Sequence, residues 1–373
     1  MKKAVFMTLA LLAQLVWGND GVYFVSGNQL VPVRETDISI TSEVLTISIG
    51  DDGFARVDVQ YEFNNHGQAR DVEMGFEAYA PYNVDNTTLS KDGRHPFIRD
   101  FTVVMNGQPL TCRNAVIDAS EGQTGFRPLD LSQWRVFEDA ANNLEYIHKA
   151  DSILPYAYAY CFKAPFKEGV NTVHHTYRYR MSYGVGRTFE IDYWLTPALR
   201  WENGRIDDFT MRIKAENTAK HFCMSDTLFT AAPFRIEGTG KMRTIQHPYD
   251  GQYIEVSLRN ATLEWHTRDF VPRDNITIYA ADILYAFSEK PVLGSFYDRG
   301  EGFHLWGFDE QQADRRILRN LPYAHRGYVF RDKRLREYFS QLWWYMPDER
   351  WKASTADFTP GDWRVVGKMR ENK

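Results

Sequence analysis

Three absences in the sequence narrow the functions that this chain can have. It contains no G-x-S-x-G nucleophile elbow, no H-E-x-x-H zinc motif and no phosphate-cradling loop with lysine. Its three cysteines, Cys112, Cys161 and Cys223, lie far apart, without the short spacings of a zinc site. No long apolar run follows the first residues. The sequence therefore predicts no catalytic group, cofactor or metal site.

Residues 1–18 have the pattern of a secretory signal peptide. Two lysines precede an apolar run that ends at Trp17, and the small residue Gly18 follows it. A membrane-spanning helix needs about 20 apolar residues, and the polar residues after Gly18 end this run too early. We therefore expect cleavage near Gly18, a secreted product in the periplasm or outside the cell, and no transmembrane segment after cleavage.

The cysteine count leaves two alternatives for an exported protein. An oxidising compartment would let one pair of the three cysteines form a disulfide and would leave one thiol free. The sequence does not say which pair closes. Alternatively, all three are buried thiols that behave as small apolar side chains.

Apolar residues alternate with polar ones over most of the segment from Asp37 to Asp282. In the segment 55–63 every second residue is apolar, as expected for a strand with one face on a core. The segment 173–183 repeats the pattern and places His174 and His175 on opposite faces, so the two rings cannot chelate one ion by themselves. Turn sequences such as Asn106-Gly107 separate the strands. The predicted fold is mainly β, with tandem antiparallel β-sandwich-like units and a small all-α C-terminal module.

The predicted domains follow from length and from changes in residue pattern. A chain of 373 residues exceeds what one core usually serves. Apolar residues at helical spacing, beginning with Leu131 and Trp134, predict a helical insertion in the first unit. The divisions are a signal peptide at 1–18, a β-sandwich-like unit at 19–150 with a helical insertion near 130–150, a second β-rich unit at 151–286, a linker at 287–308 and a helical module at 309–373.

Helix signals dominate the C-terminal module. A first helix is expected to end at Pro322, and a second to begin with Asp332 as its N-cap. Thr359 followed by Pro360 predicts the start of a closing helix that turns Trp363 inward. Residues 309–373 carry 14 Lys and Arg against 10 Asp and Glu, whereas the whole chain has a net charge of −5. The module therefore has the charge to meet an anionic surface.

The segment from Arg319 to Tyr345 resembles the YARHG domain, a bacterial extracytoplasmic module with the pattern R-N-x-x-Y-A-R-H-G-Y-x-F. This chain has His325-Arg326 where the family pattern has Arg-His, and Pro322 stands where another apolar residue is usual. The matching positions are Arg319-Asn320, Tyr323-Ala324, Gly327-Tyr328, Phe330, Leu335, Tyr338-Phe339 and Trp344-Tyr345.

Residues 19 to about 285 resemble a second family of secreted bacterial proteins, the domain of unknown function 4424 family. The resemblance depends on Asn19-Asp20-Gly21, the segment 26–32, the strand 38–45, Gly75-Phe76 and the segment 193–206. Neither family carries an established activity. The two resemblances therefore imply an architecture and an exported location, and no reaction.

Two interpretations fit the loop that contains His325 and Arg326. Together they could hold a carboxylate or phosphate of a partner, or they could tie the loop to the helices of a small core. The candidate partner-binding residues are Arg319, Tyr323, His325, Arg326, Tyr328, Arg331, Trp344 and Tyr345.

The functional prediction is a non-enzymatic, exported protein of the bacterial cell envelope. Its C-terminal module would bind cell-wall material, such as an anionic cell-envelope polymer, or another envelope protein, and no nucleic acid is expected as a partner. One alternative is an envelope hydrolase that uses carboxylates such as Glu138, Asp139 and Asp192. The other is a periplasmic carrier of an apolar ligand, which needs an enclosed apolar cavity.

Overall fold

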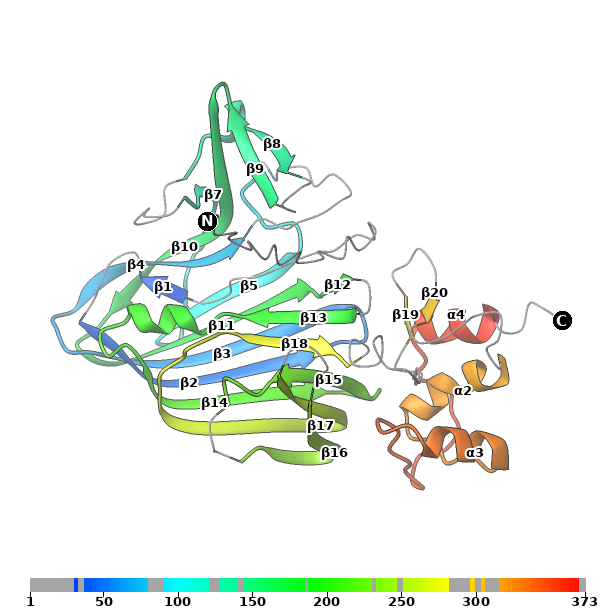
Figure 1. Ribbon diagram of the computed structural model, residues 1–373. Coiled ribbons are helices and arrows are strands. Elements are labelled where there is room, and N and C mark those ends of the chain that lie inside the picture. Colours follow the sequence, from blue (N-terminus) through cyan, green and yellow to red (C-terminus); the bar gives the residue numbers. More distant parts are fainter. Residues whose placement is uncertain are drawn as a thin grey trace, which may run out of the picture.

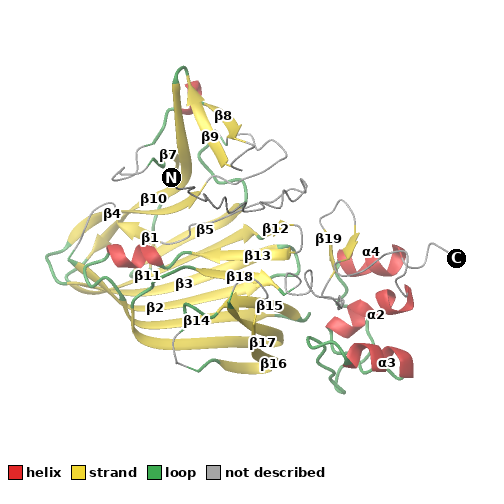
Figure 2. Ribbon diagram, in the orientation of Figure 1, coloured by secondary structure: helices red, strands yellow, loops and turns green. Residues whose placement is uncertain are grey.

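A computed structural model of the chain describes most residues between 30 and 368. These are residues 30–32, 37–79, 90, 92–120, 128–139, 144–184, 187–229, 233–246, 251–281, 296–298, 303–305 and 315–368. They are mainly β, with short helices near the C-terminal end (Figures 1 and 2), which confirms the predicted fold class. The predicted signal peptide, 1–18, and most of the predicted linker, 287–308, lie outside the described residues.

The larger sheet contains 12 strands. Most neighbours are antiparallel, but β2 and β14 run parallel. In spatial order the strands are β12 (Ser182–Gly184), β13 (Arg187–Tyr193), β18 (Ile276–Ala280), β15 (Lys220–Ser225), β17 (Gln252–Phe270), β14 (Ile206–Ala215), β2 (Ile38–Ile49), β3 (Phe54–Asn65), β11 (Gly169–Arg180), β5 (Ile98–Met105) and β6 (Gln108–Pro109), while β16 (Arg235–Gln246) pairs with β17.

The smaller sheet contains six strands. Its centre is the long strand β10 (Ser152–Phe166), which pairs with three others. The remaining strands are β1 (Leu30–Pro32), β4 (Arg70–Tyr79), β7 (Arg113–Asp118), β8 (Arg135–Asp139) and β9 (Leu144–Lys149). A separate hairpin joins β19 (Phe296–Asp298) to β20 (Phe303–Leu305).

The predicted alternation appears directly in the burial of the strands. Along β3 the residues from Ala55 to Phe63 are buried at every second position. On β11, His175 is fully buried while His174 lies half exposed beside Asp58, so the prediction that the two rings occupy opposite faces is confirmed. Asn106 and Gly107, in the turn that joins β5 to β6, both have positive φ, at 49° and 79°, as a tight hairpin turn requires.

One continuous apolar core lies between the folded parts of the β region. The larger sheet curls over itself (Figure 1), so that β13 meets β2 and β3. The Tyr193 hydroxyl on β13 donates to the fully buried Glu43 on β2 at 3.1 Å and lies 3.2 Å from the Tyr61 hydroxyl on β3. The smaller sheet covers another part of the same face. There Phe76 of β4 packs on Tyr177 of β11, with 4.9 Å between the ring centroids.

Strand pairing divides the β region near residue 181 and not near residue 150, where the sequence placed the boundary. Strands β1 to β11 pair only with one another, apart from the contact of β2 with β14, and strands β12 to β18 form the remaining pairs. The segment around residue 150 is the turn between β9 and β10, which are hydrogen-bonded neighbours. The sequence could not show this because β10 and β11 find their partners far upstream in the chain.

The helical insertion expected near 130–150 is wrong. After a 3-10 turn at Leu131–Gln133, the strands β8 and β9 pair as a hairpin. Leu131 and Trp134 do lie one helical turn apart, and both pack on the cluster that contains Ile147 and Tyr158. Their spacing therefore fits a local turn, while the residues that follow pair as strands because packing with neighbouring strands overrides local helical spacing.

The C-terminal module contains the helices α2 (Arg315–His325), α3 (Lys333–Ser340) and α4 (Pro360–Lys368). Helix α2 continues through Pro322 to His325, so the prediction that it ends at Pro322 is wrong. A proline this close to the end of a helix removes only one backbone hydrogen bond, and the packing of its neighbours outweighs that loss. The predicted start of the first helix, within 309–314, lies outside the described residues.

Candidate functional site

Helices α3 and α4 of the C-terminal module begin with the capping residues that the sequence predicted. The Asp332 side chain accepts from the backbone N–H of Leu335 at 3.0 Å. At the start of α4, Asp362 accepts from the Thr359 N–H at 2.8 Å, while the Thr359 hydroxyl accepts from the Asp362 N–H at 3.2 Å. This reciprocal capping box turns Asp362 inward. Trp363 consequently points out and is 47% exposed, so its predicted inward position is wrong.

Arg326 lies in the interior of the module. Only 2% of the residue is exposed, and its guanidinium donates to the carbonyls of Pro322 and Asp357 and to the Asp362 carboxylate, at 2.9, 2.7 and 2.6 Å. It also lies over the Phe358 ring, with 4.8 Å to the ring centroid. The side chain therefore joins α2 to the start of α4, as the second interpretation of this loop expects.

A second buried arginine joins the module to the β region. Arg259 of β17 is 3% exposed and donates to the carbonyls of Arg326 and Met346, at 2.6 and 3.1 Å. Gly327 makes this approach possible, because a Cβ atom there would lie 2.6 Å from the Arg259 guanidinium carbon. Its φ of +80° also favours glycine. We call this set of contacts the Arg259 junction.

Neighbouring strands extend the Arg259 junction. The backbone N–H of Ala219 donates to the carbonyl of His325 at 2.9 Å, and the Ser257 hydroxyl donates to the carbonyl of Trp344 at 3.2 Å. The ring of Trp343 has the Arg243 guanidinium 4.6 Å from its centroid. Hydrogen bonds to several backbone carbonyls of the module, and one contact with an aromatic ring, therefore hold the module against the sheet.

Strand β17 carries one sequence signal that bears on the Arg259 junction. Glu255, Ser257 and Arg259 occupy every second position of β17 and form one polar face of that strand. All three are buried, at 0%, 0% and 3% exposure. A polar face of this kind shows where side chains point, but it does not reveal that another part of the chain covers them.

The candidate partner-binding residues divide into an interior and an exterior group. His325 lies edge-on to Trp344 with 4.6 Å between ring centroids, and the Tyr345 hydroxyl donates to the carbonyl of Tyr328 at 2.5 Å. Burial lowers the pKa of His325 to about 4, and the nearby Asp362 carboxylate opposes that shift only in part. The buried members are Arg326, Trp344 and Tyr345, the half-buried ones are Tyr323, His325 and Tyr328, and the exposed ones are Arg319 and Arg331.

Exposed cations gather on α2, α3 and the short segment between them. Arg316 of α2 reaches Asp332 at the start of α3 at 2.7 Å, so this part of α2 lies beside the start of α3. Asp332 and Glu337 supply negative charge within the same segment. The exposed cations of this cationic face are Arg315, Arg316, Arg319, Arg331, Lys333, Arg334 and Arg336.

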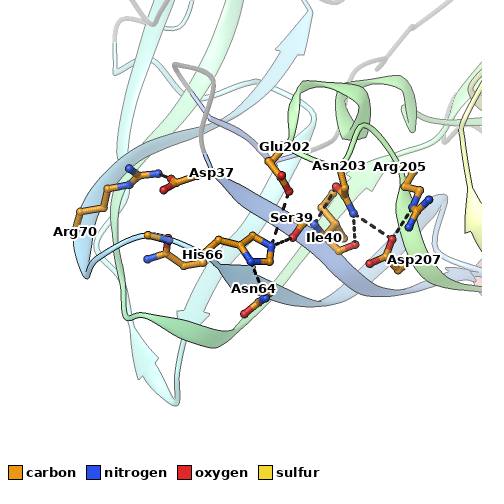
Figure 3. A network of polar contacts seen from close by, with 12 residues as sticks. Asp37, Ser39, Ile40, Asn64, His66, Arg70, Glu202, Asn203, Arg205 and Asp207 are labelled. Atoms are coloured by element: carbon orange, nitrogen blue, oxygen red, sulfur yellow. Dashed lines mark hydrogen bonds and ion pairs between the residues drawn. The ribbon is translucent and has the colours of Figure 1, made fainter.

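One arrangement of side chains invites comparison with a catalytic triad. Figure 3 shows His66 between Ser39 and Asn64, with Glu202 nearby. The Ser39 hydroxyl lies 2.9 Å from His66 Nε2, but the Glu202 carboxylate approaches that same nitrogen, at 3.8 Å. In a triad the carboxylate binds the other ring nitrogen, which here faces Asn64. Ser39 is also only 4% exposed, so the arrangement lacks the geometry of a nucleophilic site.

Adjacent contacts in Figure 3 explain this network as a structural tie. The Asn203 side chain accepts from the backbone N–H of Ile40 at 3.3 Å and donates to the carbonyl of the same residue at 3.0 Å. Asn203 thereby replaces a strand partner at the end of β2. The residues of the hydrolase alternative lie on strands of different sheets: Glu138 and Asp139 belong to β8 of the smaller sheet, and Asp192 belongs to β13 of the larger one.

Metal and thiol chemistry find little support in the described part of the chain. Its His, Cys, Asp and Glu side chains form no group of three or more suited to a metal ion. Cys112, Cys161 and Cys223 are all free thiols, and burial raises the pKa of Cys112 and of Cys161 to about 11. Within the described residues, no helix has the length and apolar character needed to cross a membrane.

Comparisons with known proteins place the chain in a family. Residues 18–232, more than half of its length, match the family described as Domain of unknown function (DUF4424), and the chain belongs to that family. Residues 308–372 match the YARHG domain. Both matches confirm the resemblances stated from the sequence. No curated protein matches the chain.

The comparison with solved structures finds matches at low sequence identity. A candidate nutrient-binding protein of Legionella pneumophila is 16% identical, with a TM-score of 0.50, and the match covers 94% of this chain and all (100%) of that one. An M1 zinc metallopeptidase of Deinococcus radiodurans is 10% identical, with a TM-score of 0.25, and the match covers 67% of this chain and 43% of that one. At this identity the similarity to the Legionella structure shows the fold alone.

Proposed function

We propose that this protein is an exported, non-enzymatic component of the bacterial cell envelope that binds an anionic envelope polymer through the cationic face of its YARHG domain. The observation that carries the proposal is the set of seven exposed Arg and Lys side chains on α2, α3 and the segment between them. Such a surface attracts polyanions by long-range charge and holds them by charge-assisted hydrogen bonds.

Burial decides which of the candidate residues contact the polymer in this proposal. Arg319 and Arg331 are exposed and supply direct contacts, while Arg326, Trp344 and Tyr345 hold the module in shape. Export through the segment 1–18 would bring the cationic face to the envelope. The Legionella relative is itself described as a candidate nutrient-binding protein, which agrees with a binding role for this class of protein.

Binding to purified peptidoglycan sacculi tests the proposal. The protein should be residues 19–373, because the Arg259 junction makes the β region part of the module's support. We expect Arg319→Glu with Arg331→Glu to weaken cosedimentation at least roughly tenfold, since two attractive contacts become repulsive. Raising the salt concentration should weaken binding by the unchanged protein.

A matched control is available on the β region. Arg235 and Arg268 are exposed arginines on β16 and β17, away from the YARHG domain, so Arg235→Glu with Arg268→Glu changes the net charge equally. That control should bind as the unchanged protein does. Equal binding by the Arg319 and Arg331 variant would contradict the proposal, as would the capture of an envelope protein in place of the polymer, which supports the alternative partner.

A further inference from the structure

A line of cations crosses the solvent face of the larger sheet. Strand register places Lys214 of β14 opposite Ser48 of β2, Ser48 opposite Arg56 of β3, Arg56 opposite Arg178 of β11, and Arg178 opposite Arg99 of β5. All five side chains are exposed or half-buried. These residues, which we call the cation row, come from sequence positions as far apart as 48 and 214.

The cation row is costly for the isolated protein. Like charges directly opposite each other on adjacent strands destabilise a sheet, and three arginines stand side by side here. Asp52 offsets part of this cost by accepting from Arg56 at 2.7 Å and from Arg178 at 2.9 Å. Asp100 adds a weaker pair with Arg178 at 3.5 Å. Four cationic side chains therefore stand against these two carboxylates, so the cation row has a net positive charge.

The cation row borders a groove with a volume of about 500 Å³. The next row of side chains across the same strands is Arg212 of β14, Thr46 of β2, Asp58 of β3 and Thr176 of β11, and the Arg212 guanidinium is paired with the Glu264 carboxylate at 2.8 Å. These four side chains and Gln60 line the groove there, and Thr46, Asp58, Gln60 and Thr176 offer a hydroxyl, amide or carboxylate to a ligand. The groove therefore pairs a cationic side with a side that suits a ligand rich in hydroxyl groups.

The length and surface of the groove narrow the class of ligand. Five neighbouring strands spaced about 4.8 Å apart give the cation row a length of about 19 Å, too long for one small anion. A single-stranded nucleic acid would need exposed aromatic rings on which its bases stack. Phe54, an aromatic residue beside the cation row, is already covered by Arg178 and Arg99, whose guanidinium carbons lie 4.9 and 5.1 Å from its ring centroid.

We propose that this groove binds an acidic oligosaccharide, stretched across strands β14, β2, β3, β11 and β5. Its acidic groups lie on the cation row, and its hydroxyls bond to the side that contains Asp58 and Thr176. The ligand displaces Asp52 from the position it shares between Arg56 and Arg178. The site is separate from the cationic face of the YARHG domain.

Calorimetric titration of residues 19–373 with an oligogalacturonate long enough to span the row tests this proposal. Arg56→Gln with Lys214→Gln should weaken binding at least roughly tenfold, because two of the four cations are lost. Arg235→Gln with Arg268→Gln, outside the groove on the same sheet, should leave binding unchanged. A neutral malto-oligosaccharide of equal length and a polyphosphate of equal charge should each bind at least roughly tenfold more weakly than oligogalacturonate.

Several outcomes would overturn the proposal. They are no binding by the unchanged protein, equal binding by the Arg56 and Lys214 variant, and binding of the neutral sugar or of polyphosphate as tight as that of oligogalacturonate. The Arg319→Glu with Arg331→Glu variant separates this site from the YARHG domain. It should bind oligogalacturonate normally, and a loss there would assign the ligand to the cationic face instead.

Discussion

The β region and the YARHG domain bury polar groups in different ways. In the β region, the ring nitrogens of His175 and the hydroxyls of Tyr177 and Tyr179 are buried without a hydrogen-bond partner among the described residues. In the YARHG domain, Arg326 has three hydrogen bonds and an aromatic ring around its guanidinium. The large core tolerates unpaired neutral groups, whereas the small one places a paired charge at its centre.

Core size explains the difference. The β region shares one apolar cluster between both sheets, so the cost of a few unpaired polar atoms is spread over much buried area. Among the described residues, the YARHG domain has a separate cluster of ten buried hydrophobic residues. A core of that size gains little stability from apolar burial alone, so ties such as those of Arg326 and Arg259 contribute a larger share.

The largest predicted effect comes from the Arg326 tie. Arg326→Ala should lower the stability of the YARHG domain by about 3–5 kcal/mol, because it leaves the Asp362 carboxylate, 3% exposed, buried without its counter-charge. Urea unfolding followed by the fluorescence of the domain's tryptophans measures this change. A loss below about 1 kcal/mol would contradict the view that charge pairing holds the small core together.

A paired substitution separates the charge from the packing. Arg326→Met with Asp362→Asn keeps an unbranched side chain in place and retains an oxygen for the α4 cap, but it leaves no unpaired charge. This double variant should be clearly more stable than Arg326→Ala. If the two variants are equally unstable, the hydrogen bonds to backbone carbonyls are the important part of the tie.

Acid should destabilise both regions between about pH 6.5 and pH 4. Burial lowers the pKa of His325 to about 4 and that of His175 to about 3, below their ordinary value of 6.5 in the unfolded chain. In this pH range the histidines bind protons in the unfolded state but stay neutral in the native state. The free energy of unfolding therefore falls as the pH drops through this window. The slope is at most about 1.4 kcal/mol per pH unit for each histidine.

Substitution at the two histidines assigns the effect to a region. His325→Phe keeps a ring against Trp344 and should flatten the pH dependence of the YARHG domain alone. His175→Phe should act on the β region alone, with the added benefit that two unpaired nitrogens are removed. An unchanged pH profile in either variant would show that the histidine concerned titrates normally in the native state.

The smallest predicted effect concerns the Arg259 junction. Arg259→Met should lower the free energy that couples the unfolding of the two regions by about 1–3 kcal/mol, because the carbonyls of Arg326 and Met346 lose a charged donor. Two separated unfolding transitions should then replace a shared one in calorimetry. Trp363→Ala, which removes an exposed ring, is the control and should leave the transitions in place. A single unchanged transition in Arg259→Met would show that other contacts couple the regions.

Local signals predicted much of the fold because they depend on near neighbours. The alternation in 55–63 identified β3, Asn106-Gly107 identified a hairpin turn, and Asp332 identified the start of α3. The hairpin of β8 and β9 was missed because Leu131 and Trp134, just before β8, have a spacing that fits a helix. No local pattern distinguishes a helix from a strand whose partner lies elsewhere in the chain.

The candidate site was predictable only in outline. The resemblance to the YARHG domain located its aromatic and basic side chains, but the inward turn of Arg326 depends on Asp362, 36 positions away. The inward turn of that carboxylate in turn explains why Trp363 is exposed. Exposure, which separates Arg319 and Arg331 from the other candidates, is a property of the packed domain.

The amino-acid sequence by itself determined the β character of the chain, the helical character of its C-terminal domain and its resemblance to the DUF4424 family and to the YARHG domain, since periodicity and motifs are local properties. Only the tertiary structure decided that strands on both sides of residue 150 share their sheets, that Arg259 supports the YARHG domain, and that Lys214, Arg56, Arg178 and Arg99 form one row. The reason is physical: register and burial depend on which distant segments pair, and pairing is settled by the packing of the whole core.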